Sequence, residues 1–487
     1  MKLRMQFVLM LAAGVASQVV SIAVSMILVR HLTKETFGIF SQVNFLIQFT
    51  SMILIAGIPG SVLYFYPRLS EEQKKGFFIQ TIAILAFFGT VGSVILHLLS
   101  PLMGAQFNNP SLPSILSYYS YAVGLTMLAA FFPAFLMVTG RVRQAALTAF
   151  MLQVGQGAAM LSALYMVGSL HGIFLFQISF LTLFVFGGLV TTLFLLRKET
   201  FRLDLSLLLE QITYFLPITA SNSVHYAGKQ IDRYFVSAKF PVATFATFEL
   251  GAREFPFVSQ ISENIGTVSK SKLSELAHKK DYTGLIRLWC DLMRKSWLMY
   301  CPLMALLFVT ADDIYAILYT DSFVEAANLF RIFLLVMIFR TLNVGLIIES
   351  VGLTRVTGVA SLFFAVSNVV LIFVFLHFFD MGLMGPPVAT LLSYLAMVVM
   401  QAASLRRYCG IDLLRVMPFQ YFLKVALITL AAALVGWLLM QTQTVGVLRI
   451  VAFCIGFVPT VLSGSWVSGL LDEEEKGMLR KAVRLSF

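Results

Sequence analysis

The stretch from Tyr214 to Glu263 reads YFLPITASNSVHYAGKQIDRYFVSAKFPVATFATFELGAREFPFVSQISE. It interrupts a chain whose other long segments are almost entirely apolar. Charge is costly inside a membrane and usually faces a wet cavity or a charged partner. This stretch therefore decides how many helices the chain forms and where a polar substrate would pass. Among its charged and strongly polar residues are Asn222, His225, Lys229, Asp232, Arg233, Glu249, Arg253, Glu254 and Glu263.

The composition around this stretch indicates an integral membrane protein. Of 487 residues, 59% are hydrophobic and 12% are charged, whereas a soluble chain carries about 25% charged residues. The formal net charge is +11. Lys and Arg gather in the loops between apolar runs, which is typical of cytoplasmic loops and makes nucleic-acid binding an unnecessary explanation.

The apolar runs predict an all-α protein with about fourteen transmembrane helices, because a span needs about 20 apolar residues. No run alternates as the strands of a membrane β-barrel do. The two spans within the quoted stretch are poor on hydropathy alone. The predicted spans are 7–29, 37–58, 76–100, 115–138, 144–168, 171–196, 211–237, 242–266, 296–311, 322–349, 355–379, 383–405, 418–440 and 445–470.

Loop charge predicts the topology. Basic loops such as 68–75, 141–143 and 270–287 alternate with loops poor in Lys and Arg, such as 101–114, or acidic, such as 312–321. The positive-inside rule then places both termini in the cytoplasm. An even number of spans is required, which fourteen and twelve both satisfy.

A short internal repeat favours the higher number. Thr36-Phe37-Gly38-Ile39-Phe40 follows the first span, and Thr244-Phe245-Ala246-Thr247-Phe248 follows the seventh. A basic loop comes next in both places. The repeat predicts two lobes of six helices in parallel orientation, residues 1–200 and 201–409, with two additional helices and a tail in 410–487. Parallel repeats are a known transporter plan, with the site between the lobes near mid-membrane.

The cysteines and histidines predict neither a metal site nor a cofactor site. The four Cys have no CxxC spacing, and of the six His only His225 lies well inside a span. This pattern is not that of a zinc site or a disulfide framework.

Two motifs resemble those of a known family. Val29-Arg30-His31-Leu32 with Phe37-Gly38-Ile39-Phe40 is similar to the first-loop pattern of the multidrug/oligosaccharidyl-lipid/polysaccharide (MOP) exporter superfamily, within which the likeness is to polysaccharide and O-antigen repeat-unit flippases. Ile231-Asp232-Arg233 looks like the counterpart in the second lobe, where Ala246 stands in place of the usual Gly.

The resemblance implies a flippase that carries isoprenyl-pyrophosphate-linked oligosaccharides from the cytoplasmic to the outer leaflet by alternating access. It implies no bond chemistry, a bacterial cytoplasmic membrane, and possible partners among polysaccharide polymerases and other assembly proteins. A lipid-linked peptidoglycan precursor is another substrate that the resemblance leaves open.

Independently of the resemblance, the residue types and their spacing predict a polar path through the membrane. A sugar and a pyrophosphate cannot cross hydrocarbon without large cost, so they need a wet groove with cations. Spacings of three and four place the polar side chains of the seventh span on one helix face. The predicted substrate-binding residues are Asn222, His225, Lys229, Arg233, Arg253 and Arg340.

The carboxylates allow two interpretations. Asp232 and Glu249 are the candidates for ion or proton coupling. Alternatively, Lys229 with Asp232, and Glu249 with Arg253 at helical i,i+4 spacing, are neutralising pairs that let these helices pack. The sequence leaves both interpretations open.

A further prediction concerns residues 281–295, where Leu285, Trp289 and Leu292 alternate with basic residues. This pattern is typical of an amphipathic helix on the membrane surface.

Two other functions compete with flipping. A drug or cation antiporter of the same superfamily carries cationic substrates, which the cations Lys229, Arg253 and Arg340 disfavour. A membrane polymerase or glycosyltransferase needs catalytic groups on a sizeable loop, and the predicted outward loops are short and carry no recognisable catalytic set.

Overall fold

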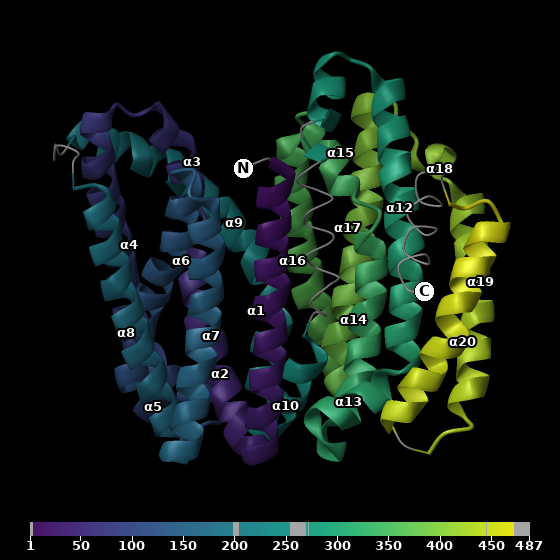
Figure 1. The fold of residues 1–487 in the computed structure, drawn as a ribbon, viewed down its shortest axis with the longest axis horizontal. Coiled ribbons are helices and arrows are strands. Elements are labelled where there is room, and N and C mark those ends of the chain that lie inside the picture. The colour runs from purple at the N-terminus through teal and green to yellow at the C-terminus, as the bar shows by residue number, and fades with distance from the viewer. Residues whose placement is uncertain (1–2, 198–203, 254–268, 271, 445, 472–487) are drawn as a thin grey trace. The chain divides into compact units, whose positions relative to one another are not determined.

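The computed structural model describes residues 3–197, 204–253, 269–270, 272–444 and 446–471. Within these residues every regular element is helical (Figure 1). The helices are α1 (Leu3–His31), α2 (Lys34–Ile55), α3 (Ile58–Phe65), η1 (Tyr66–Arg68), α4 (Glu71–Gln106), α5 (Leu112–Tyr119), α6 (Ala122–Val138), α7 (Val142–Met166), α8 (Leu170–Leu195), α9 (Leu205–Lys239), α10 (Val242–Gly251), α12 (Tyr282–Val309), α13 (Ala311–Tyr319), η2 (Asp321–Phe323), α14 (Ala326–Arg340), α15 (Val344–Ser350), α16 (Thr354–His377), η3 (Gly382–Met384), α17 (Gly385–Cys409), α18 (Leu413–Val416), α19 (Phe419–Met440) and α20 (Gly446–Val467).

The prediction of an all-α membrane protein is confirmed. Eleven helices of the described residues are long and apolar enough to cross a membrane, and α5 with α6, bent by 49°, makes a twelfth. These twelve coincide with twelve predicted spans. The other two are the polar spans: α9 forms a single helix of 35 residues, and α10 covers only the beginning of 242–266, of which residues 254–266 lie outside the described residues. Fourteen spans therefore stay a prediction.

Helix beginnings follow local side-chain chemistry. The Thr33 hydroxyl accepts a hydrogen bond from the Thr36 amide where α2 begins, and Ser70 with Gln73 forms a capping box at the start of α4. Such caps satisfy amide groups that have no partner within the helix and are each worth about 1 kcal/mol. These polar residues stand between apolar runs, so they set where one span ends and the next begins.

The chain divides into two compact units by its contacts. The first contains Met1–Leu250 and Ala365–Pro386, and the second contains Gly251–Phe364 and Pro387–Phe487. The division into lobes at 1–200 and 201–409 stays a prediction.

In the first unit, α4, α6, α7 and α8 are neighbouring upright helices (Figure 1), and α1 packs along α7 while α2 packs against α9. Aromatic side chains fill its interior: the rings of Phe78 and Phe135 lie 4.7 Å apart, and both residues are buried. α4 and α6 approach closely at Gly89, where a Cβ atom would come within 2.6 Å of Gly124 Cα. Small residues at such crossings let membrane helices gain van der Waals contact.

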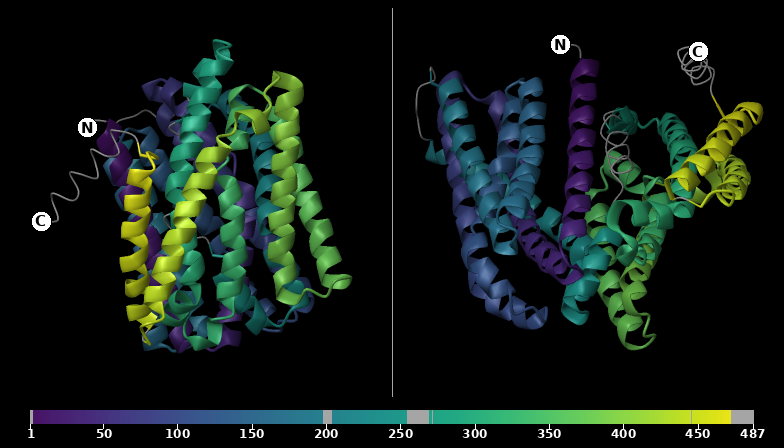
Figure 2. Two further views of the ribbon diagram at one scale, coloured as in Figure 1. Left: turned by 90° about the vertical axis from the view of Figure 1, so that its right-hand side faces the viewer. Right: turned by 60° about the horizontal axis from the view of Figure 1, so that its bottom comes forward.

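In the second unit, the structure corrects the interpretation of residues 281–295. Asp281 caps α12 and residues 282–295 form its first part, and Leu285, Trp289 and Met293 are buried in a core with residues of α15, α17 and α19. The apolar face thus covers protein rather than the membrane surface. The last two helices of the described residues, α19 and α20, run side by side (Figure 2).

Candidate functional site

The predicted site helix, α9, begins at a strong cap. The Asp204 carboxylate accepts hydrogen bonds from Ser206 Oγ at 2.6 Å, the Ser206 amide at 3.1 Å and the Leu207 amide at 3.3 Å. The hydrogen bond from the Ser206 hydroxyl, followed by that from the Leu207 amide, lowers the pKa of the Asp204 carboxyl. Its negative charge also suits the positive end of the helix dipole. From this cap α9 runs through Pro217 to Lys239.

Small hydroxyl side chains hold the middle of α9 against the break between α2 and α3. Thr219 Oγ1 accepts a hydrogen bond from the Gly57 amide at 3.0 Å, and Ser223 Oγ donates to the Ile53 carbonyl at 2.8 Å. Asn222 Nδ2 lies 3.4 Å from the Ala56 carbonyl oxygen. These contacts satisfy backbone groups that the break would leave without a partner, and they fix the rotation of α9.

That rotation decides which polar side chains are exposed. Asn222 and Lys229 are exposed and His225 is half-buried, so the face predicted from spacing carries amide, imidazole and ammonium groups in sequence along one helix. His225 and Lys229 also make contacts within the protein. A helix that presents such groups inside an apolar chain is suited to a hydrated path.

Charged residues at the C-terminal part of α9 form a cluster with α10. Arg233 Nε donates to Glu249 Oε2 at 2.8 Å, and a terminal nitrogen of Arg233 contacts Gln230 Oε1 at 2.5 Å. The side chains of Arg233 and Glu249 are only 19% and 22% exposed. Their mutual attraction offsets the cost of removing two charges from water.

Asp232 is the most buried charged residue of this cluster, at 3% exposure. Its carboxylate accepts a hydrogen bond of 2.8 Å from the Arg233 amide. Within the described part of the chain this bond, rather than one from Lys229, is the one that Asp232 makes. Burial of a carboxylate is costly unless an opposite charge lies near it, and the Arg233 guanidinium of the same cluster supplies that charge.

The structure changes the pairing predicted for Glu249. Its described ion-pair partner is Arg233, across the turn between α9 and α10. The predicted pairing with Arg253 requires one continuous helix, and α10 ends at Gly251. Arg253 lies beyond that end, half-buried and in the second unit.

Arg340 also lies at a helix end, although the sequence places it midway along a span. It is the last residue of α14, and the chain turns before α15 with Asn343 in a left-handed conformation (φ 48°). The indole nitrogen of Trp289 donates to the Leu342 carbonyl in this break at 3.1 Å. A cation suits the negative end of a helix dipole, so the break gives Arg340 a local electrostatic reason for its position.

Two buried amide networks in the first unit were missed by sequence reasoning. Gln211 Nε2 donates to Ser61 Oγ at 3.2 Å and to Thr81 Oγ1 at 3.0 Å, while Gln80 donates to Gln211 Oε1 at 3.1 Å. These bonds tie α9 to α3 and α4. The only signal in the sequence was Gln211 itself, at the start of a predicted span.

The second network connects α9 to α2. Gln42 Nε2 donates to Ser237 Oγ at 2.8 Å, and Asn109 Nδ2 donates to Gln42 Oε1 at 2.7 Å. All three residues are at most 2% exposed. Gln211 and Gln42 each bond through both their amide oxygen and their amide nitrogen to partners far away in the sequence, so the networks position α9 rather than bind a substrate.

Comparison with known proteins identifies the fold and the family. A family model described as polysaccharide biosynthesis protein matches residues 27–328. No curated protein sequence matches significantly.

Solved structures share the fold at low identity. The lipid II flippase MurJ in an inward closed conformation aligns with a TM-score of 0.73 at 15% identity, covering 94% of this chain and 98% of that one. An inward-facing multidrug resistance MATE family transporter of the MOP superfamily aligns at 0.65 and 12% identity, covering 83% and 95%. A MOP superfamily transporter from Pyrococcus furiosus aligns at 0.59 and 12% identity, covering 82% and 95%.

These neighbours are a flippase and transporters, not enzymes. Together with the family match and the apolar helices, they identify a multi-pass membrane protein that has the same fold. The resemblance found in the first-loop motifs is thereby confirmed, because solved structures of the MOP superfamily share the fold, and the chain belongs to the polysaccharide biosynthesis protein family.

Proposed function

We propose that this protein carries isoprenyl-pyrophosphate-linked oligosaccharide repeat units from the cytoplasmic to the outer leaflet of a bacterial cytoplasmic membrane, by alternating access, for surface polysaccharide assembly. One observation carries the proposal: α9 presents Asn222, His225 and Lys229 along one face of a helix in an otherwise apolar protein. The family match to polysaccharide biosynthesis proteins names the class of pathway that this polar face would serve.

The proposed substrate has two incompatible parts. Its hydrocarbon tail stays in the lipid at no cost, whereas the sugars and the pyrophosphate lose their hydration in hydrocarbon. A polar helix face supplies replacement hydrogen bonds for the sugar hydroxyls, and Lys229 supplies a positive charge for the phosphates. Binding through one face leaves the tail outside the protein, so tail length would matter little.

Arg233 would take part differently from Lys229, because Glu249 already neutralises it. A pyrophosphate that approached Arg233 would compete with Glu249 for the guanidinium. Displaced from its partner, the Glu249 carboxylate would be available to another cation. This exchange, with buried Asp232 beside it, would couple substrate binding to ion binding. Arg253 and Arg340 remain predicted cations of the path.

The sequence-based topology completes the proposal. Both termini face the cytoplasm, and polymerases that consume the repeat units on the outer side are the expected functional partners. The alternative is a multidrug or cation antiporter, as in the MATE transporters that share the fold.

Lipid analysis of cells that lack this protein tests the proposal directly. We expect a complete isoprenyl-pyrophosphate oligosaccharide to accumulate inside while surface polysaccharide falls, and its structure would name the substrate. Purified protein in liposomes should then make that lipid accessible to an enzyme added outside. Normal surface polymer with no accumulated lipid, together with efflux of cationic dyes from the same liposomes, would favour the antiporter instead.

A further inference from the structure

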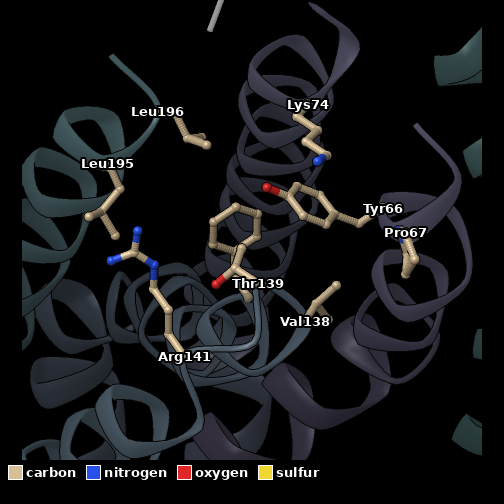
Figure 3. Close-up of a pocket in the computed structure, with 9 residues that line it drawn as sticks. Tyr66, Pro67, Lys74, Val138, Thr139, Arg141, Leu195 and Leu196 are labelled. Carbon is tan, nitrogen blue, oxygen red and sulfur yellow. The ribbon is translucent and has the colours of Figure 1, made fainter. Parts of the chain in front are cut away.

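A pocket of about 310 Å³ lies at one end of the first unit, apart from the polar face of α9. Residues from η1, α4, α6, α8 and the turn before α7 line it. Figure 3 shows the side chains of Lys74 and Arg141 extending toward the same space from two sides. We refer to it as the Lys74–Arg141 pocket.

The two cations have different surroundings. Lys74 forms an ion pair with exposed Glu71, and its Nζ atom lies 5.7 Å from the centre of the Tyr66 ring. Arg141 is exposed, and its guanidinium makes no hydrogen bond or ion pair to any residue that the structure describes. It is also the residue that precedes α7, whose first turn has no side-chain cap. Uncapped amides at a helix start add partial positive charge.

The walls between the two cations are apolar. Phe135 and Leu196 are buried, and the Phe135 ring packs edge-on against the Tyr66 ring at 5.2 Å. Leu195 completes this side (Figure 3). A small inorganic anion would leave these walls in contact with water, whereas a phosphate ester with apolar chains would satisfy both the cations and the walls.

The surrounding loops place the pocket at a membrane surface. It opens among the ends of helices that carry Arg68, Lys75, Arg143 and Arg197, which belong to the loops predicted to be cytoplasmic. Anionic phospholipids are enriched in the cytoplasmic leaflet, and basic pockets between helices on that side bind their head groups.

We propose that the Lys74–Arg141 pocket binds the phosphate head group of an anionic glycerophospholipid from the cytoplasmic leaflet. Lys74 and Arg141 contact the phosphate oxygens from two sides, the phosphate displaces Glu71 from Lys74, and the acyl chains leave across the side of Leu195. The bound lipid joins the ends of α4, α6, α7 and α8, so it stabilises the first unit. This proposal does not depend on the transported substrate.

The experiment compares two double variants that remove the same charge. K74Q/R141Q alters the pocket, whereas K75Q/R143Q alters the neighbouring lysine and arginine, which do not line it. Delipidated protein in detergent is titrated with phosphatidylglycerol, phosphatidylcholine or glycerol 3-phosphate. Native mass spectrometry counts bound lipid, and thermal unfolding measures stabilisation. Equal elution volumes and equal lipid-free unfolding temperatures of the two variants establish that both fold.

We expect phosphatidylglycerol, and not phosphatidylcholine, to bind and stabilise the unaltered protein and the K75Q/R143Q variant. K74Q/R141Q should bind it about thirtyfold more weakly, since it removes two cations that are each worth about 1 kcal/mol near a membrane surface, and about 1.4 kcal/mol corresponds to a tenfold change in affinity. An equal loss of phosphatidylglycerol affinity in both variants would mean that basic surface residues attract the lipid without a defined site, and would overturn the proposal. If glycerol 3-phosphate stabilises the protein as much as phosphatidylglycerol does, the pocket binds a soluble phosphate ester. If an isoprenyl pyrophosphate selectively displaces phosphatidylglycerol, the pocket binds the transported lipid. Either result overturns the proposal.

Discussion

Arg233 and Glu249 show what spacing along the chain can and cannot predict about individual residues. The spacing predicts that Asn222, His225, Lys229 and Asp232 share one helix face, and all four lie on α9, but Asp232 is buried whereas Asn222 and Lys229 are exposed. It suggested neighbours on the same helix as ion-pair partners, yet the described partner of Arg233 comes from the next helix. Helical periodicity fixes a side chain's direction, but the partner depends on a turn whose geometry a periodic pattern does not contain.

The cation on the exposed face of α9 gives the first prediction. Lys229→Ala should weaken binding of an isoprenyl-pyrophosphate lipid about tenfold to a hundredfold, because a charge-assisted hydrogen bond to phosphate is worth about 1.5–3 kcal/mol. Arg253→Ala is expected to have a similar effect. Binding is measured with the purified variants.

Lys424→Ala is the matched control, since Lys424 is exposed on α19 in the second unit. It is a better control than Arg449, which lies 3.2 Å from Asp313 and therefore has a structural role. Equal affinities for all three variants and the unaltered protein would remove the cation argument.

Buried Asp232 gives the second prediction. If its carboxylate takes part in coupling, Asp232→Asn keeps the shape and the hydrogen bond from the Arg233 amide but loses the titratable group. Transport by the variant in liposomes should then be slower and should no longer change with pH. Glu249→Gln serves for comparison, because it frees Arg233 as well. Full transport by Asp232→Asn with an unchanged pH profile would contradict a coupling role.

At the scale of single elements, Gly38 explains why the first-loop motif has its form. A Cβ atom at this position would lie 2.2 Å from the Val242 carbonyl oxygen and 2.7 Å from a Val242 side-chain carbon. α2 therefore touches the start of α10 so closely that only glycine fits. In the second copy of the motif, Ala246 is fully buried and its methyl group is accommodated. The two copies differ because their helix contacts differ.

The third prediction follows from that contact. Gly38→Val should lower the folding stability by about 1–3 kcal/mol, as overpacking typically does, and should reduce the yield of monodisperse protein. Gly187→Val is the control: Gly187 lies within α8, and a Cβ atom there would meet nothing within 4 Å. Thermal unfolding of both purified variants measures the difference. Indistinguishable unfolding temperatures would mean that α2 and α10 move apart at little cost.

For the whole molecule, the sequence predicted the apolar helices well and the packing of polar segments poorly. Twelve predicted spans coincide with helices that could cross a membrane, because hydropathy over about 20 residues reports directly on partition into lipid. Residues 281–295 were misplaced, since an amphipathic pattern is the same whether lipid or protein covers it. The networks of Gln211 and Gln42 could not be predicted, because their partners come from distant helices.

The fourth prediction concerns topology. In a chain whose four native cysteines are replaced by serine, Lys280→Cys should react with a membrane-impermeant thiol reagent only from the cytoplasmic side. Gln441→Cys, in the turn between α19 and α20, should react only from outside. Both positions are exposed. Labelling of intact cells and of inverted vesicles distinguishes the sides. Labelling of Lys280→Cys in intact cells would reverse the predicted orientation.

The bond between Gln42 and Ser237 has a consequence for the order of events during synthesis. These residues are separated by 195 positions, so at a synthesis rate of about 5–20 residues per second Gln42 waits for its partner on the order of ten seconds or longer. During that time the Gln42 side-chain amide of α2, which is buried in the folded protein, lacks its hydrogen bond to Ser237 and faces lipid. The early helices of a nascent chain must therefore be shielded by the insertion machinery, or by one another, until α9 arrives. A chain that stops before α9 would display these amides permanently, which is the kind of signal by which a membrane protease can recognise an unfinished protein.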